Sequence, residues 1–493
     1  MSSEVAATEL PDAGRAAEGA RAETPSSLSG DGLPLVTCIL PARGHGELVA
    51  RAIECFLAQD YPNKELVIVD DGVPSSDVVP QDDRIRHVRL ESAVSLGDKR
   101  NRGCEVARGT IIAHFEARDW HAPSRLSRQV HHLVARKVHM TALSEESPVA
   151  DTLVYWRVVW EKLTQHPRGT NDTESLFVKV ARHLAASYSP LPLDGQVIRD
   201  RSSDDGSGET LRPAEALSED GRPLPLITCT MPTYGREKFI PQAILYFRRQ
   251  DYPNKELLIL DDSATAPDIE VPESGNIVFV HLRRRLILGE KRNLCCELAR
   301  GEIIAQWDDD DWFAPTRLSV QVAPLLHEGA HMSVLHLRDV LMLNLRVIRT
   351  APQPRFIDGY FMFWKVLWRE KAKYGHSTCG EIMAFYHAAK KCAKIVNIMD
   401  GAQAVYIRHQ SNTWQNADWK LHWRRRFSIQ RRVEDVIPAE DLPFYLRLMG
   451  MEAADAGAAG HSAPRVAVPT PSTRRRDAEL MGRPLDGAEL QPG

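Results

Sequence analysis

The chain has 493 residues and a net charge of −4; 43% of its residues are hydrophobic and 26% are charged. This is the composition of an ordinary soluble protein with enough apolar residues for two or three domains of about 100–200 residues each. A pI near 6.5 gives no general basic field for nucleic acid, and no stretch approaches the roughly 18–20 apolar residues that cross a bilayer. We therefore expect no nucleic-acid partner and no transmembrane segment.

The N-terminal segment, residues 1–32, is rich in Ala, Gly, Ser and Glu and lacks the positive start and apolar run of a secretory signal. We expect it to be disordered and the protein to be cytoplasmic. The eight cysteines include no C-x-x-C pair, and several lie inside apolar runs, where cysteine behaves as a small hydrophobe. The pattern predicts reduced thiols, with neither a disulfide framework nor a structural zinc.

The chain contains two copies of one sequence. The string QDYPNKEL occurs at residues 59–66 and again at 250–257, and the motifs around it recur at the same spacing. A period of about 190 residues is far too long for a solenoid repeat, so it indicates two whole domains in tandem. The expected organisation is a first domain at 33–203, a polar linker at 204–223, a second domain at 224–414, a basic and aromatic helical extension at 415–450, and a disordered tail at 451–493.

In chain order, each copy alternates short apolar runs with amphipathic stretches. The runs are LVTCIL, ELVIVD and GTIIAHF in the first copy and LITCTM, ELLILD and GEIIAQW in the second. Helical stretches such as GELVARAIECFLAQ and REKFIPQAILYFRRQ separate them. This alternation predicts an α/β fold with a mainly parallel sheet flanked by helices, in which ligands gather beyond the carboxyl ends of the strands. Functional residues should therefore follow the strands.

Carboxylates follow two of the expected strands in the second copy. Asp261 and Asp262 end the run ELLILDD, and four consecutive aspartates, 308–311, follow GEIIAQW. Adjacent carboxylates repel one another by roughly 1 kcal/mol per pair in water, so the cluster calls for a cation. Mg²⁺ and Mn²⁺ accept oxygen ligands and commonly use one or two carboxylates together with substrate phosphate. A solvated acidic turn is the alternative, which the flanking Trp307 and Trp312 disfavour.

The ordered set MPTYGRE, ELLILDDS, LGEKRN and AQWDDDDWFAP resembles the nucleotide-sugar-binding half of family 2 glycosyltransferases with the GT-A fold. The resemblance covers roughly residues 33–203 and 224–414. It implies Rossmann-like domains, a nucleotide-sugar donor such as a UDP-sugar, and transfer to a hydroxyl acceptor with inversion. It also implies a divalent cation, Mn²⁺ or Mg²⁺, held by a DxD-type motif at a strand end.

By this resemblance, Asp308 and Asp310 occupy the outer positions of the DxD motif and bind the metal. Tight turns, a helix cap and exposed helix charges are the alternative interpretation of the remaining motif residues. The residues expected to bind the nucleotide sugar are Pro232, Thr233, Tyr234, Asp261, Asp262, Lys291, Arg292, Asn293 and Asp309.

The family places the base that takes the acceptor proton in a Glu-Asp pair before an aromatic residue on a helix. The matching stretch STCGEIMAF offers Glu381, with Ile382 where the aspartate would be, so Glu381 is the candidate base and Asp358 a reserve. The family also often places a histidine in a late loop near the metal. His409 in YIRHQSNTW is the candidate, with a structural or surface role as its alternative.

The first copy lacks several of these residues. Arg118 stands at the position of Asp310 and puts a permanent positive charge where the metal would bind. Thr173 stands opposite Glu381, and Asp200 stands opposite the late-loop histidine. We therefore expect the first domain to be degenerate. Two active domains that add sugars alternately are the alternative.

Beyond the second copy, residues 417–436 interleave Trp419, Trp423 and Phe427 with five arginines. At a spacing of four, these aromatic residues share one face of a helix. The pattern predicts either a helix packed on the second domain or an interfacial helix that meets anionic lipid.

Together these patterns predict a metal-dependent, inverting glycosyltransferase with its active site in the second domain, acting on a glycan, a lipid-linked acceptor or a protein. The competing hypothesis is a non-catalytic nucleotide- or carbohydrate-binding scaffold, which the missing aspartate at Ile382 supports. Metal-assisted hydrolysis ranks last because the sequence offers no evident nucleophile.

Overall fold

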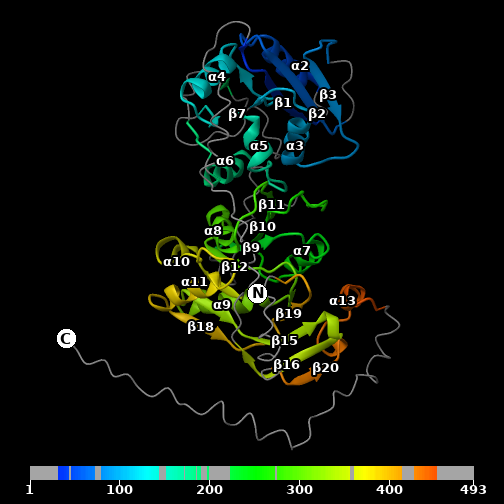
Figure 1. Cartoon of the computed structure of the whole chain (residues 1–493), viewed down its shortest axis with the longest axis vertical. Coiled ribbons are helices and arrows are strands. Elements are labelled where there is room, and N and C mark those ends of the chain that lie inside the picture. Colours follow the sequence, from blue (N-terminus) through cyan, green and yellow to red (C-terminus); the bar gives the residue numbers. More distant parts are fainter. Residues whose placement is uncertain are drawn as a thin grey trace, which may run out of the picture.

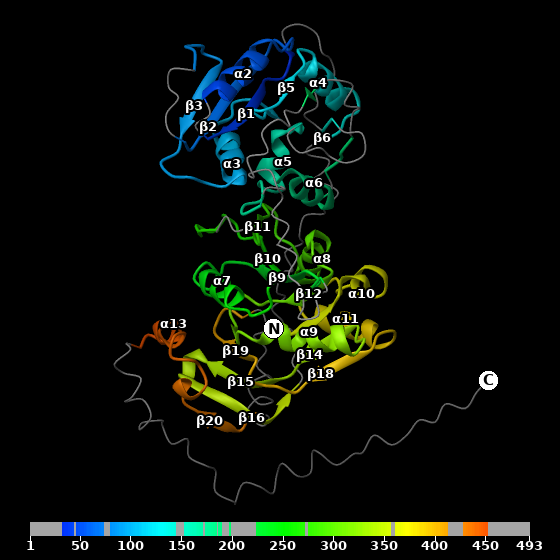
Figure 2. The ribbon, with the colours of Figure 1, turned by 180° about the vertical axis from the view of Figure 1, so that it is seen from behind.

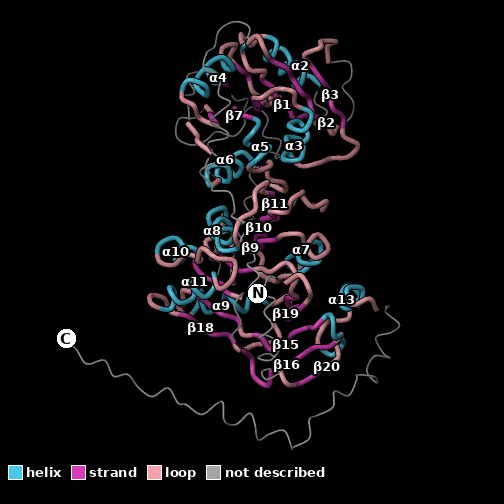
Figure 3. Tube along the Cα trace, viewed as in Figure 1, coloured by secondary structure: helices cyan, strands magenta, loops and turns pink. Residues whose placement is uncertain are grey.

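The computed structural model describes residues 32–43, 46–72, 79–143, 152–170, 173–184, 186–189, 197–198, 223–271, 275–355, 360–412 and 427–451. Two α/β units follow one another along the chain, the first at the top of Figure 1 and the second below it. Figure 2 gives the view from behind, and Figure 3 shows the alternation of helices and strands in both units. The expected fold class is confirmed.

The first copy builds a six-stranded sheet in the order β3-β2-β1-β4-β7-β6. Strands β3, β2, β1 and β4 are parallel, whereas β7 is antiparallel to both of its neighbours. The elements are β1 Val36–Ala42, α2 Gly46–Leu57, β2 Lys64–Asp70, β3 Ile85–Arg89, α3 Leu96–Val106, β4 Ile111–His114, β5 Trp120–His121, α4 Arg125–Ala135, β6 Met140–Thr141, β7 Val154–Trp156, α5 Arg157–Lys162, α6 Thr173–His183 and β8 Val197–Ile198.

The second copy repeats this plan in a seven-stranded sheet, in the order β11-β10-β9-β12-β17-β14-β18. Its strands β11, β10, β9 and β12 are parallel, and β17 is antiparallel to β12 and β14. The elements of this sheet and the helices around it are β9 Ile227–Thr233, α7 Ile240–Arg248, β10 Lys255–Asp261, β11 Ile277–His281, α8 Leu288–Leu298, β12 Ile303–Gln306, α9 Arg317–His327, β14 Met332–Leu335, β17 Phe361–Trp364, α10 Lys365–Glu370, α11 Glu381–Lys390 and β18 Ile395–Ile398.

Continuous apolar runs form the central strands because both of their faces are covered. All seven residues of β1 and all seven of β2 are buried. Helix α2 is amphipathic and buries Val49, Ala52, Ile53 and Phe56, which recur at helical spacing. Buried parallel strands covered by one-sided helices are the arrangement that the sequence pattern predicts.

A five-stranded sheet in the second copy was not expected from the sequence. Its order is β13-β19-β15-β16-β20, with strands β13 Trp312–Phe313, β15 Leu337–Met342, β16 Val347–Arg355, β19 Ala404–Arg408 and β20 Ile429–Arg431. The short strand β13 begins directly after the acidic turn and pairs with β19, Trp312 facing Val405. This pairing brings the loop after β19 to the carboxyl end of β12.

The prediction of a helix C-terminal to the second copy is partly wrong. Trp419 and Trp423 lie outside the described residues, but Ile429–Arg431 forms strand β20 rather than a helix. Strand β20 pairs with β16, and Phe427 is buried against Val340 there. Sheet pairing and burial of one aromatic residue therefore override the helical spacing. Helix α13 follows at Leu442–Leu448.

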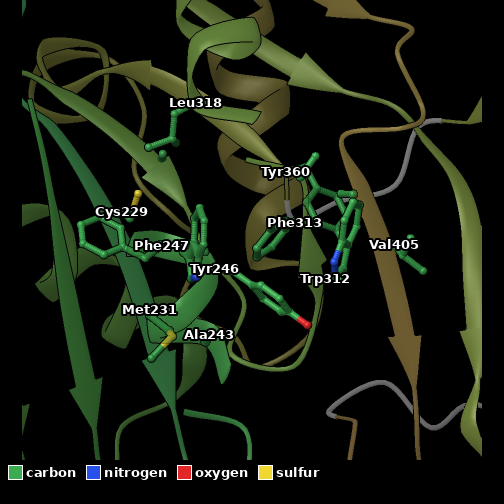
Figure 4. Packing of buried hydrophobic residues seen from close by; sticks show 14 of the residues in the cluster. Cys229, Met231, Ala243, Tyr246, Phe247, Trp312, Phe313, Leu318, Tyr360 and Val405 are labelled. Atoms are coloured by element: carbon green, nitrogen blue, oxygen red, sulfur yellow. The ribbon is translucent and has the colours of Figure 1, made fainter. Parts of the chain in front are cut away.

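An aromatic core lies beside the acidic turn of the second copy. Tyr246, Phe247, Trp312, Phe313 and Tyr360 belong to one buried cluster, and Figure 4 shows Tyr246, Trp312, Phe313 and Tyr360 gathered together in it. The indole of Trp312 also donates a hydrogen bond to Asp441, 2.8 Å away. This packing holds the residues that flank the turn in fixed positions.

All eight cysteines are free thiols, as expected; six are buried, while Cys379 and Cys392 are exposed. Within the described part of the chain, no helix has the length and apolar character needed to cross a membrane. Apart from Gly32 and Met451, the expected terminal segments lie outside the described residues. So do the reserve candidate Asp358, the comparison residue Asp200 and all of the expected linker except Pro223.

Candidate functional site

Three neighbouring parallel strands of the second sheet end at one place. Strands β10, β9 and β12 are adjacent, so their carboxyl ends bring Asp261, Thr233 and the aspartates after Gln306 to the same edge. The hydroxyl of Thr233 donates to Oδ2 of Asp309 at 2.5 Å. The carboxylates thus gather where the parallel strands end, as expected for a sheet of this kind.

The four aspartates have different partners. Asp310 accepts a hydrogen bond from Nη1 of Arg236 at 2.5 Å, and Nε2 of His409 lies 2.8 Å from the same carboxylate oxygen. Asp311 points the other way, where the hydroxyl of Tyr360 and the backbone N–H of Ile407 donate to it. Asp311 is therefore a structural group that ties the turn to β19, whereas Asp310 lies beside His409.

Burial makes the negative charge of this turn costly. It raises the pKa of Asp308, and together with the neighbouring charge of Asp310 it raises the pKa of Asp309 to about 7. Burial also opposes the ionisation of Asp310, but contact with His409 and the charge of Arg236 lower its pKa. The protein thus supplies enough positive charge for one of these three carboxylates and leaves the others short of a cation.

Arg292 connects the acidic turn to the candidate base. This buried guanidinium lies 3.4 Å from Asp308 and 3.3 Å from Glu381, which begins helix α11. Glu381 is itself buried, and the preceding residue, Gly380, takes a left-handed conformation with φ 80°. The neighbouring Ile382 packs in an apolar cluster, so no second carboxylate stands beside Glu381 on this turn of the helix.

The residues expected near the nucleotide form a second group. Lys291 donates to the carbonyl of Thr233 at 2.9 Å and to the carboxylate of Asp262. The other oxygen of Asp262 accepts from the backbone of Leu286 at 2.8 Å. Pro232 lies one residue before the end of β9.

Tyr234, which follows β9, is 41% exposed, and the Arg285 guanidinium lies 3.8 Å from the centre of its ring. The strand end therefore presents an aromatic face and a cation to solvent.

Two predicted residues point elsewhere. Asp261 is 1% exposed and binds the ring of His281 and the hydroxyl of Ser263. Asn293 accepts from the indole of Trp368 and donates to the carbonyl of Tyr374, so it holds the loop before α11. Both side chains therefore bind neighbouring protein groups and do not face the open end of the strands.

Sequence reasoning missed Arg236, Tyr360 and Asn412 as partners of the aspartates. Arg236 lies within the motif MPTYGRE, two residues after Tyr234, so its charge was a usable signal. Asn412 donates to Asp310 at 3.3 Å from a loop about 100 residues away, and no local pattern indicates that contact.

The first copy keeps the lysine–aspartate contact of this arrangement and lacks the aspartate cluster. Lys99 lies 2.7 Å from Asp71 and donates to the carbonyl of Ala42, as Lys291 does with its counterparts. Arg100 pairs with Glu116 at 2.9 Å and donates to the hydroxyl of Thr173. Where Arg292 of the second copy lies between an aspartate and a glutamate, Arg100 thus lies between a glutamate and a threonine.

The donor set of the second copy suits a hard divalent cation. Asp308 and Asp310 offer carboxylate oxygens and His409 an imidazole, and Mg²⁺ or Mn²⁺ commonly uses one or two carboxylates with substrate oxygens. Across the described ranges, however, no three His, Cys, Asp or Glu side chains converge as a complete protein-only metal site. The residues fit a metal that shares its coordination with a bound phosphate.

Comparison with known proteins follows this geometry. The sequence profile of glycosyl transferase family 2 matches residues 37–184 and 228–377, which together exceed half of the chain. The putative colanic acid biosynthesis glycosyl transferase WcaA of Escherichia coli K12 is 36% identical over 104 residues, 20% of this chain and 37% of that protein.

The UDP-Glc:alpha-D-GlcNAc-diphosphoundecaprenol beta-1,3-glucosyltransferase WfaP of Escherichia coli is 26% identical over 110 residues, 22% of this chain and 44% of that protein. The chain thus spans less than half the length of these curated relatives. Among solved structures, the mannosyltransferase PcManGT of Pyrobaculum calidifontis, in complex with GDP-Man and Mn²⁺, aligns at 17% identity with a TM-score of 0.31, covering 37% of this chain and 61% of that one.

The fold and the family match define the class of the protein as a glycosyltransferase. The chain belongs to glycosyl transferase family 2, of which it carries two tandem copies, the first without the aspartate cluster.

Proposed function

We propose that this protein transfers a sugar from a nucleotide-sugar donor to a hydroxyl acceptor, with a divalent metal and with inversion, at the second copy. The observation that supports this most is the line from Asp308 through Arg292 to Glu381, at the edge where β9, β10 and β12 end. The equivalent line in the first copy ends at Thr173, whose hydroxyl cannot act as a base at neutral pH.

The donor would lie along the strand ends. Tyr234 suits the base because its ring is exposed. Thr233 and Asp262, which are buried at the same strand ends and joined by Lys291, would line the ribose side. Lys291 and Arg292 supply positive charge for the diphosphate. The sugar-nucleotide base remains a proposal from relatives: the WfaP name specifies UDP-Glc, which favours a UDP-sugar.

Asp308 and Asp310, with His409, would hold the metal, and Asp309 would lie toward the donor. When bound, Mn²⁺ or Mg²⁺ would neutralise charge on the departing nucleoside diphosphate. Arg236 now occupies the oxygen of Asp310 that faces His409, so it would move toward the phosphates when that carboxylate binds the ion.

Glu381 would take the proton of the acceptor hydroxyl. The acceptor oxygen would then attack the anomeric carbon from the side opposite the nucleotide, so that the new glycosidic bond forms as the bond to the diphosphate breaks. The proton ends on Glu381 and the negative charge on the leaving nucleotide. Arg292, which now contacts Glu381, would be freed to face the diphosphate.

The test is donor turnover by the full chain, measured as release of nucleoside diphosphate from a panel of nucleotide sugars with and without MnCl₂. Asp310→Asn is expected to abolish turnover, while Arg118→Ala, the matched change in the first copy, leaves it intact. Asp310→Asn turning over at the wild-type rate would refute the metal assignment.

The non-catalytic scaffold is the second candidate, favoured by the apolar burial of Ile382. Comparing the wild type with Glu381→Gln separates the two. An enzyme turns over donor as wild type, and its Glu381→Gln variant keeps the nucleotide affinity but loses turnover. A scaffold binds nucleotide and turns over no donor in either form. Calorimetry with the nucleoside diphosphates measures the affinity in both cases.

A further inference from the structure

The edge of the second sheet is closed by the first copy. Strand β11 is the outermost strand of that sheet, yet all five of its residues are buried. Its counterpart β3, at the edge of the first sheet, buries only Ile85 and leaves the rest partly or fully exposed. A parallel edge strand normally leaves backbone N–H and C=O groups unpaired, so β11 must be covered by something.

The cover is a short segment of the first copy, residues 163–168, which follows α5. It runs antiparallel to β11: the backbones of Arg168 and Phe279 exchange hydrogen bonds of 2.9 and 3.1 Å, and Arg283 donates to the carbonyl of Leu163 at 2.9 Å. Gly169 makes this approach feasible, because a Cβ there would lie 2.2 Å from the carbonyl of Ile277. The segment thus makes two isolated antiparallel bridges to the edge of the sheet, and we call it the edge segment.

Side chains secure the same junction. The guanidinium of Arg168 lies 4.4 Å from the ring centre of Phe279, and that of Arg283 lies 4.7 Å from Trp160 of the first copy. Helix α6 faces α8 at this boundary, as Figures 1 and 2 both show. One apolar cluster is shared across it. Leu176 and Val180 of α6 and Leu184, which follows that helix, belong to it, with Leu258, Leu260, Val278, Val280 and Leu294 among its members from the second copy.

The edge segment reaches the donor side of the site through His281. The carbonyl of His281 accepts a hydrogen bond from the backbone N–H of Gln165 at 3.2 Å and lies 3.1 Å from the hydroxyl of Thr164. The ring of the same residue binds Asp261, with 2.7 Å between Nδ1 and Oδ2. The first copy therefore fixes the last residue of β11 directly.

From Asp261 the contacts continue to the turn after β9. The other oxygen of Asp261 accepts from the hydroxyl of Ser263 at 2.5 Å, and that hydroxyl accepts from the backbone N–H of Gly235 at 2.8 Å. Gly235 has φ 61° and directly follows Tyr234. An unbroken series of hydrogen bonds thus runs from Gln165 in the first copy to the turn that carries the exposed tyrosine.

We propose that the first copy is a positioning domain for the donor site of the second: residues 163–168 complete the sheet edge and, through His281, Asp261 and Ser263, hold the turn at residues 232–235. This assigns a role to the copy that has lost the aspartate cluster, and it rests on the proposed function. A positioning role predicts weaker donor binding when the junction is loosened, while the catalytic groups stay in place.

The experiment compares Gln165→Pro with Gln165→Ala in the full chain. Both remove the side chain, but only proline removes the N–H that binds the carbonyl of His281. Calorimetry with UDP, GDP, ADP and CDP plus MnCl₂ first identifies the nucleotide that binds the wild type. Gln165→Pro is expected to weaken its binding about five-fold, as loss of one hydrogen bond implies, and to raise KM for the donor without changing kcat.

Two controls separate positioning from general destabilisation. His183→Gln breaks another contact of the same junction, the exposed pair with Glu297 at 3.1 Å, and is expected to leave nucleotide affinity unchanged. In a Ser263→Ala background, where the series is already cut, Gln165→Pro is expected to have no further effect on affinity. If proline at this position prevents folding, Thr164→Val takes its place, with Thr164→Ser as the variant that keeps the hydroxyl.

The outcomes are distinguishable. If the wild-type chain binds none of the four nucleotides, the proposed function is wrong, and so is the assignment of a donor site to the second copy. If the wild type binds one of them and Gln165→Pro binds it equally well, or if the effect persists fully in the Ser263→Ala background, the positioning role is overturned while the proposed function stands.

Discussion

Three buried histidines make the first copy sensitive to mild acid. His114, His121 and His166 are each at most 1% exposed. Burial, helped by the charges of Arg100 and Arg125, lowers the pKa of His114 well below its usual value, and burial lowers the pKa of His121 to about 2. His121 accepts a hydrogen bond from Arg125 at 3.0 Å, which requires a neutral ring.

His166 behaves in the same way. Its Nε2 lies 2.9 Å from the hydroxyl of Tyr155, its ring lies 5.0 Å from that of His114, and burial lowers its pKa well below the usual value. All three rings therefore stay neutral in the folded protein. In the unfolded chain they titrate near pH 6.5, so below that pH the unfolded state binds protons that the folded state does not.

The magnitude follows from that difference. Between pH 7.5 and pH 5.5, each neutral buried histidine lowers the free energy of unfolding by about 1.4 kcal/mol, and three lower it by about 4 kcal/mol. The loss appears as pH falls through 6.5 and continues below it. Most carboxylates titrate at lower pH and contribute little in this window.

The second copy supplies a matched control, because it carries Gln306, Phe313 and Tyr374 at the three positions. The perturbation is the triple variant H114Q/H121F/H166Y. Hydrogen exchange of peptides from β1, β2 and β4, detected by mass spectrometry at pH 7.5 and 5.5, gives the opening free energy of the first copy alone. The wild type is expected to lose about 4 kcal/mol more than the variant. Equal losses in the two proteins would refute the reasoning.

Two further predictions concern thiols and packing. Burial raises the pKa of Cys38 and Cys229 to about 12. In the native protein, only the exposed Cys379 and Cys392 are therefore expected to react quickly with Ellman's reagent. More than two fast-reacting thiols would contradict the burial of the other six cysteines. Gly289→Ala would place a Cβ 1.8 Å from the backbone oxygen of Gly375 and is expected to destabilise the protein by about 3 kcal/mol in urea unfolding. Gly32→Ala is the control, because a Cβ there meets no atom within 4 Å, and it should leave stability unchanged. Equal stability of the two variants would show that the loop at Gly375 moves aside without cost.

The internal repeat explains why so much of the fold was predictable. Two alignable copies place the strands twice, and the acidic turn follows a strand whose residues are all buried. The five-stranded sheet was not predictable in the same way, because β13, β15, β16 and β19 find their partners only in the folded chain, and short strands depend on tertiary context.

In the site, too, some features were predictable from the sequence and others were not. Asp308, Asp310 and His409 were predicted from motifs, and the structure places Asp310 and His409 2.8 Å apart. The orientation of Asn293 was not predictable, since its motif is the same whether the side chain faces the donor or the loop that carries Tyr374. Motifs give the chemistry of a position, while direction depends on neighbours that come from distant parts of the chain.

The closed edge of β11 also bears on how the chain is made. A ribosome makes the first copy before the second, so residues 163–168 are synthesised before β11, the strand with which they pair. A fragment that begins at residue 224 would have to protect this edge alone, with Phe279 and the apolar face of α8 uncovered. In this order of the two copies, the segment that pairs with the edge is made before the edge strand; with the copies exchanged, β11 would be made before its partner.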